Sequence, residues 1–313
     1  MTFGGEFSLM STQAQTSGPT EGQVFKTHKD GFRFFDHFSK FSGLAVSQLY
    51  LLCALATAYE VISRYVFDAP TQWVFEVVMV LCATAWMLSA AYITLHNRHI
   101  GITVFYIIAS DRTKWWLDLF AMSVGILALW LLVDDTAIRA LESVMMTERA
   151  GSAFNSPAPL ILKSMLCIGS FLYLTQLYIN LYRHFQSSFA KSIILAIGAV
   201  ILLRIIAVVG EHLLGMGGLF SSINSVYGGV GAIVDPSVYV NMRDMDISIA
   251  SLIIVAMMLA LMMTGMPLGV VTLFVSILSA LAYFGYGGLY LVSTNAFGLL
   301  EKYPLVAVPL FVL

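Results

Sequence analysis

Long apolar runs separated by short polar breaks constrain this chain more than any other feature. A helix that spans a bilayer needs about 20 mostly apolar residues, and such runs recur along most of the sequence. Hydrophobic residues make up 59% of the 313 residues and charged residues only 11%, whereas soluble domains have about 25% charged residues. A transmembrane β-barrel is disfavoured, because its strands alternate apolar and polar residues in short segments. The sequence therefore predicts an all-α, multi-pass integral membrane protein.

The apolar runs fall into two length classes. Those long enough to cross a membrane are 41–64, 73–95, 115–133, 157–182 and 192–209, and the shorter ones are 247–264 and 268–284. Gly265 and Pro267 separate the two shorter runs and are typical of a tight turn. We expect these two runs to form a helical hairpin.

Basic residues gather at alternate breaks between the runs. Nine basic residues would lie on one side of the membrane: Lys26, Lys29, Arg33, Lys40, Arg98, Arg112, Lys114, Arg183 and Lys191. Four would lie on the other side: Arg64, Arg139, Arg149 and Lys163. Because positive charge gathers on the cytoplasmic side of membrane proteins, we expect a cytoplasmic amino terminus.

The break between the first two runs carries an unusual concentration of charge. Glu60 and Arg64 are spaced i, i+4 and can pair on one helix face, and Glu76 follows after a stretch that contains Pro70 and Trp73. Ionisable groups near a bilayer are costly unless they are paired. Our hypothesis is a structural clasp in which Arg64 also reaches Glu76. A contact with a partner protein and an ion path are the alternatives.

Arg204 lies near the middle of the run 192–209, with no acidic residue within one helical turn. It can extend toward the membrane surface or pair with a carboxylate on another helix, and we expect a structural pair. Asp134 and Asp135 follow the run 115–133, and we expect them to mark a solvated helix end, with the docking of a partner as the alternative.

Motifs of enzymes and cofactor-binding proteins are absent from the sequence. The glycine pairs at 217–218 and 228–229 lack the following lysine and hydroxyl residue of a Walker motif. His96 and His99 have no third ligand nearby for a metal ion. We therefore expect no catalytic site, no cofactor, no metal site and no nucleic-acid partner.

The stretch RYVFDAPTQWVFE, residues 64–76, resembles the signature of the small membrane subunit of tripartite ATP-independent periplasmic (TRAP) transporters. In that family an arginine–aromatic pair, a proline, a tryptophan and an acidic residue join the first two helices. Arg64 and Tyr65, then Pro70, Trp73 and Glu76, occupy those places.

A second stretch, HNRHIGITVF, resembles the basic segment that follows the second helix of the family. Arg98 and His99 are in register with that segment, whereas Gly101 and Thr103 stand where the family often has a basic residue and an aspartate. The similarity to the small subunit covers roughly residues 35–185.

The end of the sequence is similar to the beginning of the family's large membrane subunit, on the stretches LMMTGMPLGVVTLFVSILSALAYFG and YPLVAVPLFVL. Some members of the family fuse the two subunits, and the run 192–209 would then return the chain to the outer face. The sequence stops in an apolar run, so we expect a longer protein. The expected parts are 1–40, a cytoplasmic tail and leading segment; 41–185, the four-helix small-subunit domain; 186–246, a connecting helix and periplasmic segment; and 247–313, the truncated start of the large-subunit domain.

The resemblance implies a component of the bacterial inner membrane that takes part in secondary active uptake of an organic acid. A periplasmic binding protein would deliver the substrate and a sodium gradient would drive uptake. The substrate and sodium sites would lie in the remainder of the large subunit, so that this part acts as a scaffold in membrane lipid. The alternative is a non-transporting membrane scaffold or assembly protein complete at this length. A quinone-linked anchor is disfavoured, because no paired histidines lie within the runs to hold haem.

Overall fold

The structure, a computed structural model, describes residues 32–96, 99–102, 104–185, 187–214, 245–285 and 287–300. The chain divides into two compact units, Met1–Phe34 and Phe35–Leu313, and the contacts below lie within the second. The described residues form helices, with one isolated β-bridge between Gly101 and Pro267. The all-α class is therefore confirmed for the described residues.

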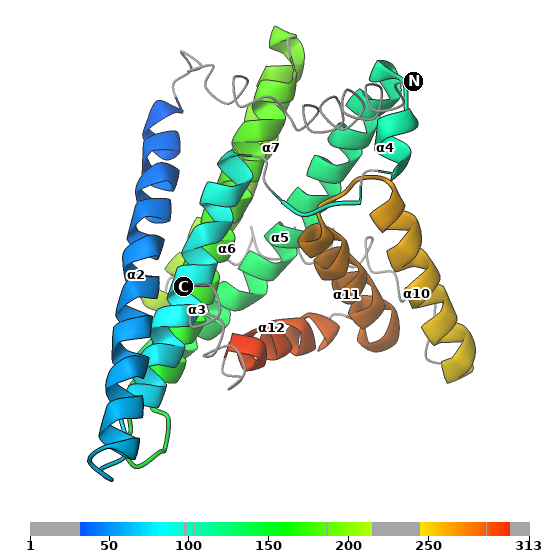
Figure 1. The fold of residues 1–313 in the computed structure, drawn as a ribbon. Coiled ribbons are helices and arrows are strands. Elements are labelled where there is room, and N and C mark those ends of the chain that lie inside the picture. The colour runs from blue at the N-terminus through cyan, green and yellow to red at the C-terminus, as the bar shows by residue number, and fades with distance from the viewer. Residues whose placement is uncertain are drawn as a thin grey trace, which may run out of the picture. The chain divides into compact units, whose positions relative to one another are not determined.

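The helices follow the apolar runs closely (Figure 1). Their bounds are α2 Arg33–Tyr65, α3 Val74–Leu95, α4 Val104–Ile108, α5 Asp111–Met145, α6 Ala158–His184, α7 Ser188–Leu214, α10 Ile247–Met263, α11 Leu268–Phe284 and α12 Gly287–Leu300. Helices α2, α3, α5, α6 and α7 are long and apolar enough to cross a membrane, as expected from the sequence. Helices α10 and α11 are the two shorter apolar ones.

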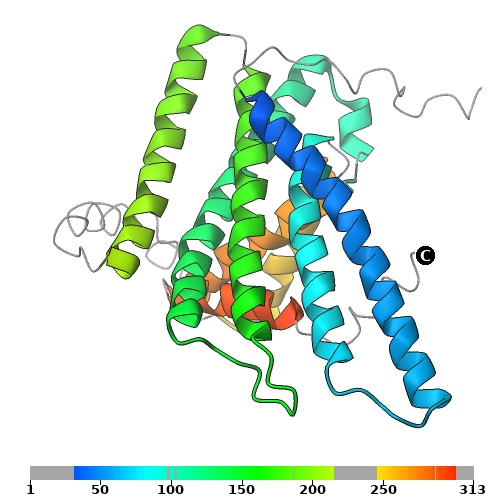
Figure 2. The same cartoon turned by 90° about the vertical axis from the view of Figure 1, so that its left-hand side faces the viewer.

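Helix α6 packs against both α3 and α5, and these are the most extensive helix pairings of the structure (Figure 2). Leu162 and Leu166 of α6 are buried in one apolar cluster with Met79 and Ala83 of α3. Helices α11 and α12 pack on α5, α12 also contacts α6, and α10 packs on α11. In contrast, only 17% of the apolar window of α2 and 22% of that of α7 is buried inside the protein. Their uncovered apolar faces suit contact with lipid.

Two features differ from the prediction. Helix α5 continues to Met145 instead of ending at Val133, so Asp134 and Asp135 lie within a helix and not at its solvated end. Asp134 and Asp135 were assigned to a helix end because unpaired carboxylates are costly beside an apolar run. Both carboxylates are paired here, which lets the helix continue through them. Helices α4 and α12 were not predicted at all. Residues 1–31, Arg98 and 301–313 lie outside the described residues, and the division into small-subunit and large-subunit parts stays a prediction.

Candidate functional site at the ends of helices α5 and α6

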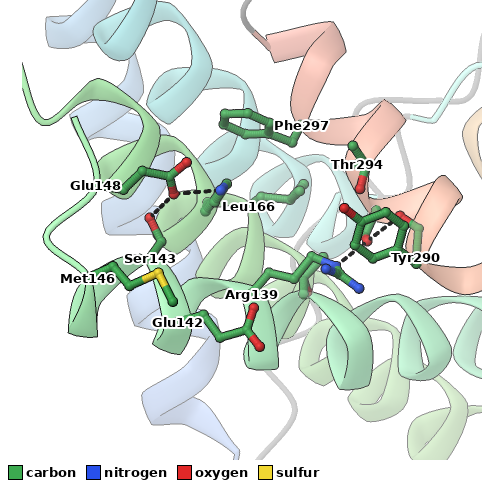
Figure 3. Close-up of a pocket in the computed structure, with 12 residues that line it drawn as sticks. Arg139, Glu142, Ser143, Met146, Glu148, Leu166, Tyr290, Thr294 and Phe297 are labelled. Carbon is green, nitrogen blue, oxygen red and sulfur yellow. Dashed lines mark hydrogen bonds and ion pairs between the residues drawn. The ribbon is translucent and has the colours of Figure 1, made fainter. Parts of the chain in front are cut away.

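A pocket of about 350 Å³ lies where the end of α5 and the beginning of α6 meet α12. Charged and aromatic side chains make up half of its 12 lining residues (Figure 3). Arg139, Glu142, Glu148, Lys163, Tyr290 and Phe297 are among the residues that line it.

Arg139 fastens α12 to α5. Its Nε donates to Asp135 Oδ2 at 2.9 Å and its Nη2 to Asp135 Oδ1 at 3.1 Å, the bidentate geometry in which arginine binds carboxylates most strongly. The same Nε lies 2.9 Å from Ser293 Oγ, and the Ser293 hydroxyl also donates to Asp135. The guanidinium carbon lies 3.9 Å from the centroid of the Tyr290 ring, a cation–π contact. We call Asp135, Arg139 and Ser293 the α12 anchor.

A second ion pair closes the other side of the pocket. Lys163 Nζ donates to Glu148 Oε2 at 2.6 Å, and the Ser143 hydroxyl donates to the same oxygen at 2.7 Å. These hydrogen bonds hold the pKa of Glu148 below its usual value. Lys163 Nζ also lies 5.1 Å from the centroid of the Phe297 ring on α12. The loop after α5, the beginning of α6 and α12 are thus joined by one polar cluster.

Glu76 holds the loop between α5 and α6, which differs from the clasp that we expected. Its side chain is only 6% exposed. The Ser152 and Ser156 hydroxyls donate to its two carboxylate oxygens, and the Ser156 N–H donates at 3.2 Å. The partners of Glu76 therefore come from a loop that is remote in the sequence, where the hypothesis had placed Arg64.

Glu60 and Arg64 form the expected i, i+4 pair on α2. Arg64 Nη2 donates to Glu60 Oε1 at 2.6 Å, and the Thr71 hydroxyl and N–H donate to Glu60 Oε2. The pair therefore ties the end of α2 to the following loop. Pro70 of that loop is exposed, and the ring of Trp73 lies 6.1 Å from that of Tyr59.

Arg204 pairs with a carboxylate on another helix. Its Nε lies 3.2 Å from Asp134 Oδ1, and its Nη2 donates to Asp134 Oδ2 at 3.2 Å. This contact joins α7 to α5. The serine partners of Glu76 and the aspartate partner of Arg204 could not be assigned from sequence spacing, because they lie on other helices and loops. Asp135 and Arg139 are spaced i, i+4, so their pairing could have been found from the sequence but was missed when Asp135 was assigned to a helix end.

His99 lies in the segment that follows α3. Its Nε2 lies 2.8 Å from Thr94 Oγ1, and its ring stacks on that of Tyr173 at 5.3 Å between centroids. Burial lowers the pKa of His99, because the charged imidazolium is disfavoured away from water. Its partner in the basic segment, Arg98, lies outside the described residues.

These side chains are arranged to cross-link helices. The carboxylates of Glu60, Glu76, Asp134, Asp135 and Glu148 each contact a second segment of the chain. The described residues contain no group of three or more His, Cys, Asp or Glu side chains that could hold a metal ion. Such an arrangement can maintain a rigid helical assembly.

A family model described as "Tripartite ATP-independent periplasmic transporters, DctQ component" matches residues 53–187. Residues 53–187 are therefore similar to a membrane component of TRAP transporters. It covers part of α2 and all of α3 to α6, which carry the Glu60, Glu76 and Lys163 contacts. No curated protein matches the chain.

The match agrees with the expectation from sequence on several points. The DctQ family is a transporter membrane subunit and not an enzyme. TRAP DctQ components work with a periplasmic binding protein and a large membrane subunit. Together with the apolar helices, the match supports a multi-pass protein of the inner membrane.

Proposed function

We propose that this chain is the scaffold part of a sodium-driven TRAP transporter that takes up an organic acid delivered by a periplasmic binding protein. The observation that carries the proposal is the DctQ match over residues 53–187. The similarity of the sequence to this family supports the sodium gradient and the organic acid. The cross-linked packing of α3, α5 and α6 supports a rigid supporting role.

We further propose that α10 to α12 belong to the beginning of a large-subunit part fused to the DctQ-like domain. Their similarity to that subunit supports this assignment, as does their packing on α5. The turn between α10 and α11 contacts the segment after α3, two breaks that the proposed order of crossings places on the same, cytoplasmic, side. This contact supports the proposed order of crossings with a cytoplasmic amino terminus.

Uptake into proteoliposomes tests the function. The chain would be reconstituted alone and with a separately expressed large subunit, in each case with a candidate binding protein loaded with a radiolabelled organic acid, with and without a sodium gradient. Uptake that requires both the large subunit and sodium would support the proposal. Uptake by this chain alone would reject the scaffold role. Absence of uptake in both preparations, with correctly inserted protein and an active control transporter, would favour the non-transporting assembly protein.

A further inference from the structure

The turn between α10 and α11 is joined to the segment after α3 through the backbone. Leu268 N–H donates to Ile100 O at 2.8 Å, and Gly101 and Pro267 form an antiparallel bridge. Because backbone groups make these bonds, side-chain chemistry does not specify them directly. We call this contact between residues 100–101 and 265–268 the turn joint.

Two positions of the turn joint favour glycine. A Cβ atom on Gly101 would lie 3.0 Å from Gly265 O and 3.2 Å from Met266 O. Both neighbours are backbone atoms, which cannot rotate away as the end of a flexible side chain can. Gly265 has φ +85°, a conformation that residues with a side chain rarely adopt, and its Cβ would lie 3.3 Å from the Tyr106 side chain.

The tip of the turn is also a buried apolar contact. Met266 is 1% exposed and belongs to one apolar cluster with Ala121 and Val124 of α5 and Tyr173 of α6. Met266 is therefore inserted among side chains of the DctQ-like domain, although it lies at a turn, where side chains are usually exposed.

The side chains of Tyr106 and His99 make contacts that stabilise the surface on which the turn packs. The Tyr106 hydroxyl of α4 donates to Asp118 Oδ2 of α5 at 3.0 Å, and the ring of His99 stacks on Tyr173. Helix α10 also contacts α4. The surface is thus shaped by segments of the DctQ-like domain on both sides of the turn.

We infer that residues 99–102, α4 and the facing sides of α5 and α6 form an assembly site that recognises a helical hairpin by its Gly-Met-Pro turn, independently of the covalent connection through residues 215–244. Assigning this hairpin to a large-subunit part rests on the proposed function. Gly101 is one of the positions at which the segment departs from the family pattern, and the close approach of the turn gives that departure a physical reason.

The test cleaves the full chain after folding. A protease site inserted between residues 215 and 244 and an amino-terminal affinity tag allow the purified protein to be cut in detergent and captured again. We expect both pieces to be recovered together from the unsubstituted protein. Gly101→Leu should lose most of the carboxyl-terminal piece, at least about tenfold, because the added side chain meets backbone atoms.

Gly269→Leu is the matched control, because it introduces the same side chain next to the turn joint, on the hairpin, where a Cβ meets nothing within 4 Å. It should retain the carboxyl-terminal piece. Met266→Ala is a second test that leaves the backbone unobstructed and should lower recovery by a smaller factor. Dissociation of the unsubstituted protein on cleavage, or full recovery with both Gly101→Leu and Met266→Ala, would overturn the inference. This experiment measures recovery of the carboxyl-terminal piece and does not depend on transport. Its failure can therefore be distinguished from absent uptake, the result that bears on the proposed function.

Discussion

The two ends of α11 are held to the rest of the protein in opposite ways. Before α11, the turn joint uses backbone hydrogen bonds and depends on the absence of a side chain at Gly101. After α11, the α12 anchor uses Arg139 and Asp135, whose side chains are 22% and 17% exposed, and depends on the presence of both charges. One contact depends on small size, and the other on a charged pair of α5 that holds Ser293 and Tyr290 of α12.

This difference predicts how each contact fails. A backbone contact tolerates changes of pH and salt but not added volume. A partly buried ion pair tolerates modest changes of volume, but loss of one partner leaves the other charge without compensation in a poorly solvated place. Substitutions that remove one charge should therefore be more damaging at the α12 anchor than at exposed pairs elsewhere.

The largest effect is expected for Arg139→Ala. Removal of the guanidinium leaves Asp135 partly buried without its bidentate partner, and we expect a loss of about 3 kcal/mol in the free energy of unfolding. A thiol-reactive dye that detects exposure of the buried Cys53 and Cys82 would report the lowered melting temperature. Lys114→Ala is the control, because its partner Asp111 is exposed and 3.9 Å away. Equal melting temperatures for the two variants would contradict the role of the α12 anchor.

Glu76→Ala should have the next largest effect. The hydroxyls of Ser152 and Ser156 and the Ser156 N–H lose their acceptor, at an expected cost of about 1–3 kcal/mol. The change should be local, with faster hydrogen exchange in the loop between α5 and α6 and little change at the α12 anchor. Unchanged exchange in this loop would show that Glu76 does not hold it.

Lowering the pH should affect the neighbourhood of the turn joint through His99. Because burial lowers its pKa in the folded protein, the unfolded chain, with an ordinary value of about 6.5, binds the proton more tightly. The stability gained from neutral His99 is present above that value and is lost as the pH falls toward the folded pKa. The melting temperature should therefore fall more steeply between pH 7.5 and 5.5 in the unsubstituted protein than in His99→Gln. If the melting temperature fell equally steeply with pH in both proteins, His99 would not be the cause of the fall.

The smallest effect is expected for Arg64→Ala. Glu76 has partners of its own and Arg64 is 50% exposed beside Glu60, a setting in which ion pairs contribute little. The melting temperature should stay within experimental error of the unsubstituted protein. A loss as large as that of Glu76→Ala would restore the clasp between Arg64 and Glu76.

Helix positions could be predicted from the sequence where a continuous apolar run had clear limits. The turn at Gly265 and Pro267 is an example: the expected run 268–284 coincides with α11, because glycine and proline interrupt helices for local reasons that the sequence contains. The i, i+4 pair of Glu60 and Arg64 was predictable for the same reason.

The contacts of the candidate site could not be predicted so well, because they depend on tertiary neighbours. Asp134 looked like part of a helix end until its partner Arg204 on α7 was known, whereas Asp135 has its partner Arg139 at the i, i+4 spacing and could have been placed within a helix from the sequence. The serines that bind Glu76 carry no signal of that role in the sequence. Gly101 was recognised as a departure from the family pattern, but only the approach of Gly265 explains it.

The length of α5 has a consequence for the surrounding bilayer. Its 35 residues extend about 52 Å at 1.5 Å per residue, whereas the hydrocarbon core of a bilayer is about 30 Å thick. The helix must therefore tilt or emerge by roughly 20 Å in total, and Arg139 lies on the surplus beyond the apolar stretch. Hydrophobic mismatch therefore affects how firmly α12 is held. A thicker membrane excludes more water from Arg139 and Asp135 and strengthens the attraction between them, whereas a thinner membrane hydrates the pair and weakens it.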